Sequence, residues 1–274
     1  MADSRVTALH QEFLPPGEER AFVWKYSDPI GGRRPRHFHR EPEINLVVRG
    51  EAVFGVGERT VRVGQGELVA FPSGQDHVLL DRSSDLYLYA IGLASDFSAE
   101  VLSGEPSLPV HVKLADAEFG LVVSKAADIV DRPGCEQLGA ELWQRIHCLS
   151  RKAAAREGRN SHVLTRRALQ LLAAAPELGL ESMARELRAH PTEVSRYFHR
   201  DMGMTLVHYR SRCRVLRFIE LASSGSEQLL AAAASAGFGS YSQCHRVFQA
   251  ELGCAPTQYL RSGLRERMQR AYVG

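Results

Sequence analysis

The sequence lacks the features of secreted, membrane-spanning and nucleotide-binding proteins. Its 274 residues include five cysteines, an odd number, and none belongs to a C-x-x-C pair. With an N-terminus that has no apolar signal core, this predicts reduced thiols in a cytoplasmic protein. No apolar run approaches the about 20 residues needed to cross a bilayer, so we expect no membrane segment. There is no phosphate-binding loop, no G-x-G-x-x-G and no Ser/His/Asp arrangement to support those chemistries.

Lysine is absent from residues 161–274, where all 15 basic residues are arginines and nine residues are acidic. That region therefore carries a net charge of +6, whereas residues 1–160 carry −4, which together give the formal +2 of the chain. An acidic first part and a basic second part indicate that the second part contacts a polyanion. A solvated basic surface is the alternative interpretation of the charge alone.

Length and pattern predict an α+β protein of several domains. From about residue 20 to 93, short alternating apolar runs are separated every 8–12 residues by glycine or proline, which predicts an antiparallel sandwich or barrel. From residue 116 the apolar spacing becomes helical. We expect a β domain with an N-terminal arm over 1–115, a helical connector and linker over 116–160, and an all-α domain over 161–274.

The connector has an apolar stripe at helical spacing, formed by Leu138, Leu142, Ile146 and Leu149. Two interpretations remain open for this stripe. It docks on the β domain, or it forms the seam of a dimer.

The all-α region contains an internal repeat with an offset of 50 residues. Arg196, Phe198, Asp201, Gly203 and Tyr209 fall on Arg246, Phe248, Glu251, Gly253 and Tyr259. Each copy reads as a short helix, a tight turn and a second helix that ends at glycine, over about 180–203 and 229–253. Pro191 suits a first helical turn and Ser240 suits an N-cap. A helical repeat used only for packing is the alternative, although packing does not require arginine at matching outward positions.

Residues 205–222 contain no glycine or proline and predict one long helix between the copies. If this helix holds the two second helices about 34 Å apart, both can enter successive major grooves of one duplex.

The two copies together resemble the AraC/XylS (arabinose-regulator) family of bacterial transcription factors over about residues 162–267. The resemblance lies in S-R-Y-F-x-x-D-M-G-M-T and in A-x-x-A-G-F-x-S-x-S-x-x-x-R-V-F-x-x-x-L-G-x-x-P-x-x-Y. It implies a DNA-binding domain of two helix-turn-helix units, a dimer, and activation through contact with RNA polymerase. The residues that it implies for DNA are Thr192, Ser195, Arg196, Arg200, Tyr241, Ser242, Gln243 and Arg246. Arg200 is expected near phosphate, whereas Arg and Gln side chains suit guanine and adenine edges. The run from Leu229 to Ala234 departs from the family's more polar helix.

The β region resembles the two motifs of cupin barrels. The first motif has Gly31, His37, His39, Glu43 and Gly50, and the second has Gly66, Pro72, Gly74, His77 and Asp81. The resemblance implies a double-stranded β-helix barrel. Asp81 departs from the usual asparagine at a structural turn.

Three imidazoles and a carboxylate, from His37, His39, Glu43 and His77, suit Zn²⁺, Ni²⁺, Mn²⁺ or Fe²⁺. Three interpretations of these residues stay open: a metal site, a polar pocket for an organic effector, and histidines with a structural role only.

The sequence thus predicts an effector-responsive regulator that binds double-stranded DNA, with a cupin domain as its sensor. A cupin metalloenzyme (dioxygenase or isomerase) with a fused helical module is the second hypothesis. A constitutive DNA-binding protein whose barrel only dimerises is the third.

Overall fold

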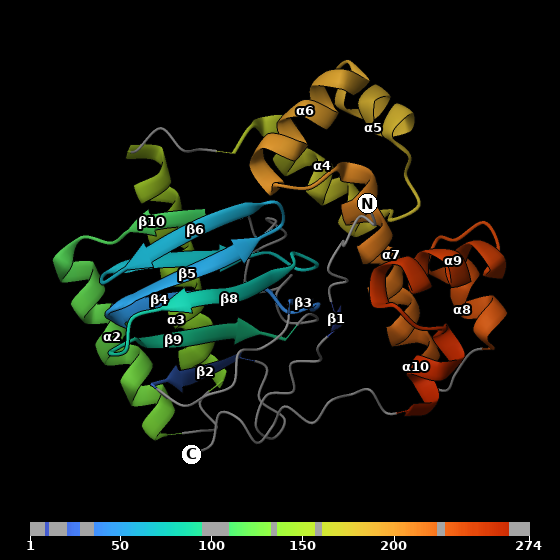
Figure 1. Ribbon diagram of the computed structural model, residues 1–274. Coiled ribbons are helices and arrows are strands. Elements are labelled where there is room, and N and C mark those ends of the chain that lie inside the picture. Colours follow the sequence, from blue (N-terminus) through green and yellow to red (C-terminus); the bar gives the residue numbers. More distant parts are fainter. Residues whose placement is uncertain are drawn as a thin grey trace, which may run out of the picture. The chain divides into compact units, whose positions relative to one another are not determined.

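The computed structural model describes residues 9–10, 21–27, 36–94, 110–132, 136–156, 161–223 and 228–262 (Figure 1). Contacts divide the chain into two compact units, whose largest continuous parts are Arg40–Ser161 and His162–Glu266. We call them the barrel unit and the helical unit. Within the described ranges, no helix combines the length and apolar character needed to span a membrane.

The β region forms two mainly antiparallel layers. One sheet has the strand order β10-β7-β4-β9-β2, and in the other β5 pairs antiparallel with both β6 and β8. Two short strands, β1 and β3, pair with each other in parallel. The bounds are β1 Leu9–His10, β2 Ala21–Tyr26, β3 His37–Phe38, β4 Glu43–Arg49, β5 Glu51–Val56, β6 Arg59–Gly64, β7 Glu67–Phe71, β8 His77–Arg82, β9 Tyr87–Leu93 and β10 Val110–Lys113.

Alternation along the strands gives the barrel unit two apolar layers. On β9, Leu88 and Ala90 pack between the two sheets with Phe54 and Phe71. The alternating residues Tyr89, Ile91 and Leu93 of β9 face the opposite side and join a core that contains helical residues. The cupin-type barrel expected from the sequence is confirmed as the fold of this region.

Two helices, α2 (Asp116–Asp131) and α3 (Glu136–Arg156), cover one sheet of the barrel unit (Figure 1). Leu142, Ile146 and Leu149 are buried in the same core as β2, β4, β7 and β9, whereas Leu138 is 40% exposed. Of the two interpretations of the connector stripe, docking on the β domain is therefore confirmed for these three residues.

Two glycines in α2 and α3 should respond in opposite ways to alanine. A Cβ on Gly139 would lie 2.7 Å from the Cβ of Ala21, whereas a Cβ on exposed Gly120 would meet nothing within 4 Å. We expect Gly139→Ala to destabilise the barrel unit by about 1–3 kcal/mol through overpacking. Gly120→Ala should stabilise it by about 0.5–1 kcal/mol, the helix preference for alanine. Urea unfolding followed by tryptophan fluorescence checks both, and equal effects would contradict the packing of α3 on β2.

The helical unit contains α4 to α10, and the sequence expectation of two helix-turn-helix units in an all-α region is confirmed. The long helix expected over 205–222 is α7. The bounds are α4 Val163–Ala174, α5 Leu180–Leu187, α6 Pro191–Met202, α7 Leu206–Ser223, α8 Leu229–Ser235, α9 Tyr241–Leu252 and α10 Pro256–Ser262. Figure 1 shows α7 running between the group α4–α6 and the group α8–α10, and it contacts members of both.

Candidate nucleic-acid interface and histidine cluster

The internal repeat is a structural repeat. Phe198 and Phe248 are both fully buried. Each packs edge-to-face on the tyrosine of its own copy, with ring centroids 5.5 Å apart for Tyr209 and 5.4 Å for Tyr259. The helices α6 and α9 each end at a glycine in the left-handed region, with φ of 67° and 72°. The sequence offset therefore identifies two copies of one packing unit.

The two acidic positions of the repeat anchor α6 and α9 to a preceding helix. Asp201 accepts hydrogen bonds from the backbone N–H of His162 and the hydroxyl of Thr165, both at 2.7 Å, at the start of α4. Glu251 accepts from Arg212 at 3.1 Å and lies 3.0 Å from Nε2 of His208, both on α7. The 50-residue offset within the sequence aligned these two acidic residues but did not indicate which groups they contact.

The N-termini of α6 and α9 are capped by different residues. Ser240 caps α9, since its hydroxyl accepts from the N–H of Gln243 at 3.1 Å. In α6, Pro191 occupies the first turn, as expected from the sequence, but the cap is His190. Its Nδ1 accepts from the N–H of Thr192 at 3.3 Å, and its own N–H donates to Glu193 at the same distance. Histidine is not among the common N-caps, so sequence alone did not signal it.

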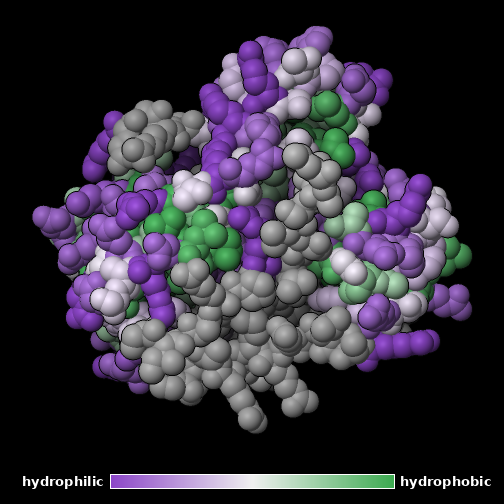
Figure 2. Space-filling view, in the orientation of Figure 1, coloured by the Kyte–Doolittle hydropathy of each residue, from purple (hydrophilic) through white to green (hydrophobic). Residues whose placement is uncertain are grey.

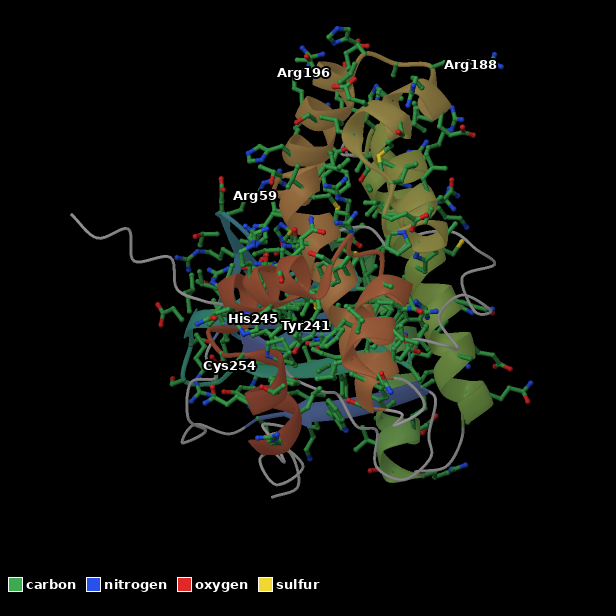
Figure 3. All side chains as sticks on the ribbon, turned by 90° about the vertical axis from the view of Figure 1, so that its right-hand side faces the viewer. Arg59, Arg188, Arg196, Tyr241, His245 and Cys254 are labelled. Atoms are coloured by element: carbon green, nitrogen blue, oxygen red, sulfur yellow. The ribbon has the colours of Figure 1, made fainter. Side chains whose placement is uncertain are left out.

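The residues predicted to contact DNA lie on α6 and α9, and none is buried. Those with exposed side chains are Thr192, Arg196, Arg200, Ser242 and Arg246; those of intermediate exposure are Ser195, Tyr241 and Gln243. Figure 3 shows Arg196 on α6 and Tyr241 on α9. Figure 2 shows mostly hydrophilic residues over the surface that α5 and α6 form.

An aromatic ring orders the basic residues of α6. Tyr197 stacks on His162 with a centroid distance of 3.6 Å, and the guanidinium groups of Arg196 and Arg200 lie 4.9 and 5.1 Å from the tyrosine centroid. Arg200 also forms an ion pair with Asp201 at 2.7 Å, and this hydrogen bond raises its pKa. Both guanidinium groups therefore contact one tyrosine ring, an interaction worth about 0.5–1 kcal/mol at an exposed site.

Gln243 of α9 is partly committed to the protein. Its side-chain oxygen accepts from the N–H of Gly239 at 2.9 Å, while its backbone N–H donates to Ser240. The side-chain amide nitrogen carries two N–H donors, so the side chain can still donate hydrogen bonds to a base edge.

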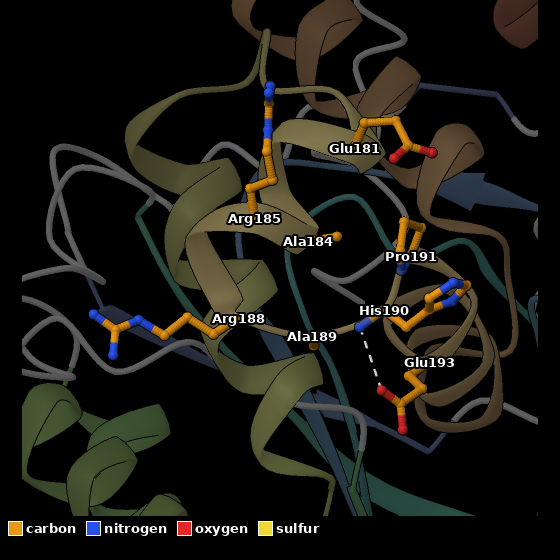
Figure 4. Close-up of a pocket in the computed structure, with 8 residues that line it drawn as sticks. All are labelled: Glu181, Ala184, Arg185, Arg188, Ala189, His190, Pro191 and Glu193. Atoms are coloured by element: carbon orange, nitrogen blue, oxygen red, sulfur yellow. Dashed lines mark hydrogen bonds between the residues drawn. The ribbon is translucent and has the colours of Figure 1, made fainter.

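The turn between α5 and α6 forms a hollow of about 420 Å³ (Figure 4). It is lined by Glu181, Ala184, Arg185, Arg188, Ala189, His190, Pro191 and Glu193. Among the described residues, Arg188 is the one non-glycine with positive φ, at 52°. The sequence gave no warning of this backbone conformation, because glycine is the residue that usually marks it.

Arg188→Gly should stabilise the helical unit, because an L-residue in the left-handed region is strained and glycine is not. We expect a gain of about 1 kcal/mol in the free energy of unfolding, or about 4–8 °C in melting temperature for a domain of about 100 residues. Circular dichroism at 222 nm measures it. Arg188→Ala is the matched control, since it removes the same charge but keeps the Cβ. An equal gain in both variants would contradict the backbone explanation.

Three histidines predicted as ligands come together. His37, His39 and His77 are buried, and their ring nitrogens lie within 4.8 Å of one another. The Nδ1 of His77 lies 3.1 Å from the carbonyl oxygen of Gln75, which can only accept a hydrogen bond. Nδ1 of His77 therefore donates this hydrogen bond, which leaves Nε2 as the ring nitrogen that can bind a metal ion. Its ring stacks on Phe71 with centroids 4.1 Å apart.

The fourth predicted ligand, Glu43, is buried on β4. Its carboxylate accepts a 2.6 Å hydrogen bond from the side-chain amide of Asn45, two residues along the same strand. In the described part of the chain, the potential ligand atoms that lie within 4.8 Å of one another come from the three histidines. Glu43 does not belong to this group.

Two domain families match the chain. A model described as a helix-turn-helix domain matches residues 183–262, and one described as a cupin domain matches residues 24–89. No curated protein matches the sequence.

Solved structures similar to the chain include two of ToxT and one of AraT. ToxT from Vibrio cholerae O395 is 13% identical, with 88% of this chain and 96% of that chain covered and a TM-score of 0.47. ToxT with bound unsaturated fatty acid is 12% identical, with 88% and 94% covered and a TM-score of 0.49. The C-terminal domain of AraT, a response regulator from Geobacillus stearothermophilus, is 25% identical over 38% of this chain and 88% of that chain, with a TM-score of 0.36.

The matched regions coincide with the strands around the histidines and with the two copies of the repeat. The chain thus combines an AraC-type helix-turn-helix domain with an N-terminal cupin domain, the combination of an effector-responsive, DNA-binding transcription regulator.

Proposed function

We propose that the chain reads a specific duplex DNA site with α6 and α9 and that its cupin domain senses a metal ion or a small molecule. The observation that carries the DNA-reading role is the structural repeat, which presents an exposed arginine at the same position of each copy, Arg196 and Arg246. An arginine at the groove-facing side of a recognition helix can donate two hydrogen bonds to a guanine. Arg200 would contact phosphate.

The proposed sensing mechanism is a shift between two populations of the protein. An effector that binds one population better than the other moves the equilibrium toward it, by no more than the ratio of the two affinities. We also propose that the chain forms a homodimer, that it activates transcription through RNA polymerase, and that it lies in the cytoplasm, where the DNA is.

The donor set fits a divalent metal. Three buried imidazoles close together, with His77 in the metal-binding tautomer, are suited to zinc, nickel, manganese or iron. In the proposal His37, His39 and His77 hold the ion and Glu43 completes the set. A bound ion would supply positive charge at this site. We also propose that the chain catalyses no reaction.

We expect about one metal ion per chain in protein purified without a histidine tag, and none in the His37→Ala/His39→Ala variant. Elemental analysis measures both. His111→Ala is the matched control, because this half-exposed histidine contacts Glu67 at 3.1 Å and should leave the metal content unchanged. If the wild type contains no metal, the metal-sensing form of the proposal is wrong, and the histidines remain as a polar pocket for an organic effector. Turnover by the metal-loaded protein would favour the enzyme hypothesis.

A further inference from the structure

Two arginines of the long helix α7 form hydrogen bonds with the segment between α4 and α5. Arg214 donates from Nε to the carbonyl oxygen of Pro176 at 3.0 Å and from Nη2 to that of Glu177 at 2.9 Å. Arg210, one turn earlier, donates to the carbonyl oxygen of Leu178 at 3.0 Å. Three consecutive carbonyls just before the first helix-turn-helix unit are thus bound to the helix that links the two units.

Arg214 also contacts the second helix-turn-helix unit. Its guanidinium lies 5.8 Å from the ring centroid of Phe238, which follows α8 and is buried. In the same turn, Gly237 has a φ of 86°, and a Cβ there would lie 3.1 Å from the Cβ of Glu177. The turn of the second unit therefore packs directly on the segment that Arg214 holds.

We infer that Arg214 fixes the orientation of the two helix-turn-helix units relative to each other and thereby determines which spacing between two DNA boxes the protein accepts. Arg214 is a positioning residue, because it acts on α6 and α9 through the backbone between α4 and α5 and through the turn before α9. Its planar guanidinium bonds two carbonyls at fixed angles while its face meets an aromatic ring, which a lysine cannot do. The inference rests on the proposed function, since it requires that both recognition helices bind one duplex.

DNA geometry makes such a constraint measurable. One inserted base pair moves the second box by about 3.4 Å and rotates it by about 34° around the duplex axis. A reader with two rigidly joined helices cannot follow that rotation without strain, whereas a hinged reader can. The spacing dependence of affinity therefore reports the stiffness of the connection between the units.

The test uses the full chain and a site selected from random duplex DNA, synthesised with its natural spacing and with one base pair inserted or removed. We compare the dissociation constants of wild type, Arg214→Met and Arg214→Lys by fluorescence anisotropy. Wild type should lose about tenfold or more in affinity at either altered spacing. Arg214→Met should bring the ratio of affinities close to one, with Arg214→Lys between the two. Arg217→Met is the matched control, because Arg217 lies on the same helix, is exposed and pairs with Glu220.

A loss of affinity in Arg214→Met that is equal at all spacings would overturn the inference, because a purely structural role lowers the amount of active protein without changing the ratio. If circular dichroism shows that Arg214→Met is unfolded, Arg210→Met decides in its place, since it removes only the bond to Leu178. A wild type that selects no sequence would contradict the proposed function itself. A wild type that selects a site but tolerates every spacing would overturn this inference alone.

Discussion

Arg246→Ala is expected to weaken binding to the selected DNA site by about tenfold to a hundredfold, with a much smaller loss on random duplex DNA. Arg246 is exposed on α9, on a helix anchored by Glu251 and capped by Ser240. Losing one two-bond contact to a base costs about 1–3 kcal/mol, which corresponds to that range. Arg196→Ala should behave in the same way, because Arg196 holds the equivalent position of the first copy.

Arg200→Ala is the informative comparison for this prediction. Its guanidinium is paired with Asp201, and we assign it to phosphate rather than to bases. Loss of a phosphate contact should weaken specific and random binding similarly and reduce the salt dependence of binding by about one ion. If Arg246→Ala lost equal affinity on both kinds of DNA, as we expect for Arg200→Ala, the base-reading role of Arg246 would be wrong.

Glu251→Leu is expected to destabilise the helical unit by about 3–5 kcal/mol. The ion pair between Glu251 and Arg212 spans 3.1 Å, and the two side chains are only 10% and 5% exposed. Removing Glu251 takes a counter-charge away from the buried guanidinium of Arg212, and breaking a buried ion pair in this way costs more than the pair itself contributed. Urea unfolding followed by circular dichroism at 222 nm measures it. Tryptophan fluorescence does not, because the two tryptophans, Trp24 and Trp143, lie in the barrel unit.

Two variants test whether burial is the cause. Glu220→Leu removes the carboxylate from an exposed pair with Arg217 on the same helix, and it should change stability by about 1 kcal/mol or less. The double variant Arg212→Met/Glu251→Leu removes both buried charges and should recover much of the lost stability. A double variant as unstable as the two single changes added together would contradict this explanation.

The sequence predicted elements wherever a local pattern was long enough. Alternation bounded by glycine located most of the strands, and helical spacing located α2, α3 and α7. The two-residue strands β1 and β3 and the four-residue β10 were missed, because two to four residues contain at most two periods of the strand alternation. The docked stripe of α3 was recognised as apolar, but its partner surface depended on the tertiary fold.

The candidate sites were predicted to different depths. Residue spacing identified His37, His39 and His77 as candidate ligands, and in the structure their ring nitrogens lie close together. Spacing did not reveal the hydrogen bond that fixes His77, because its partner is a backbone carbonyl, which every residue has. Arg210 and Arg214 carried no signal either, since their partners are also backbone carbonyls more than 30 residues away in the sequence.

Selection of bound DNA from a random pool shows whether the two helix-turn-helix units read one duplex. The full chain is incubated with the pool, and the bound duplexes are recovered and sequenced over several rounds. We expect enrichment of a site with two conserved boxes about one helical turn apart, the first lost in Arg196→Ala and the second in Arg246→Ala. Recovery of unselected sequence with equal affinity for every duplex would contradict it.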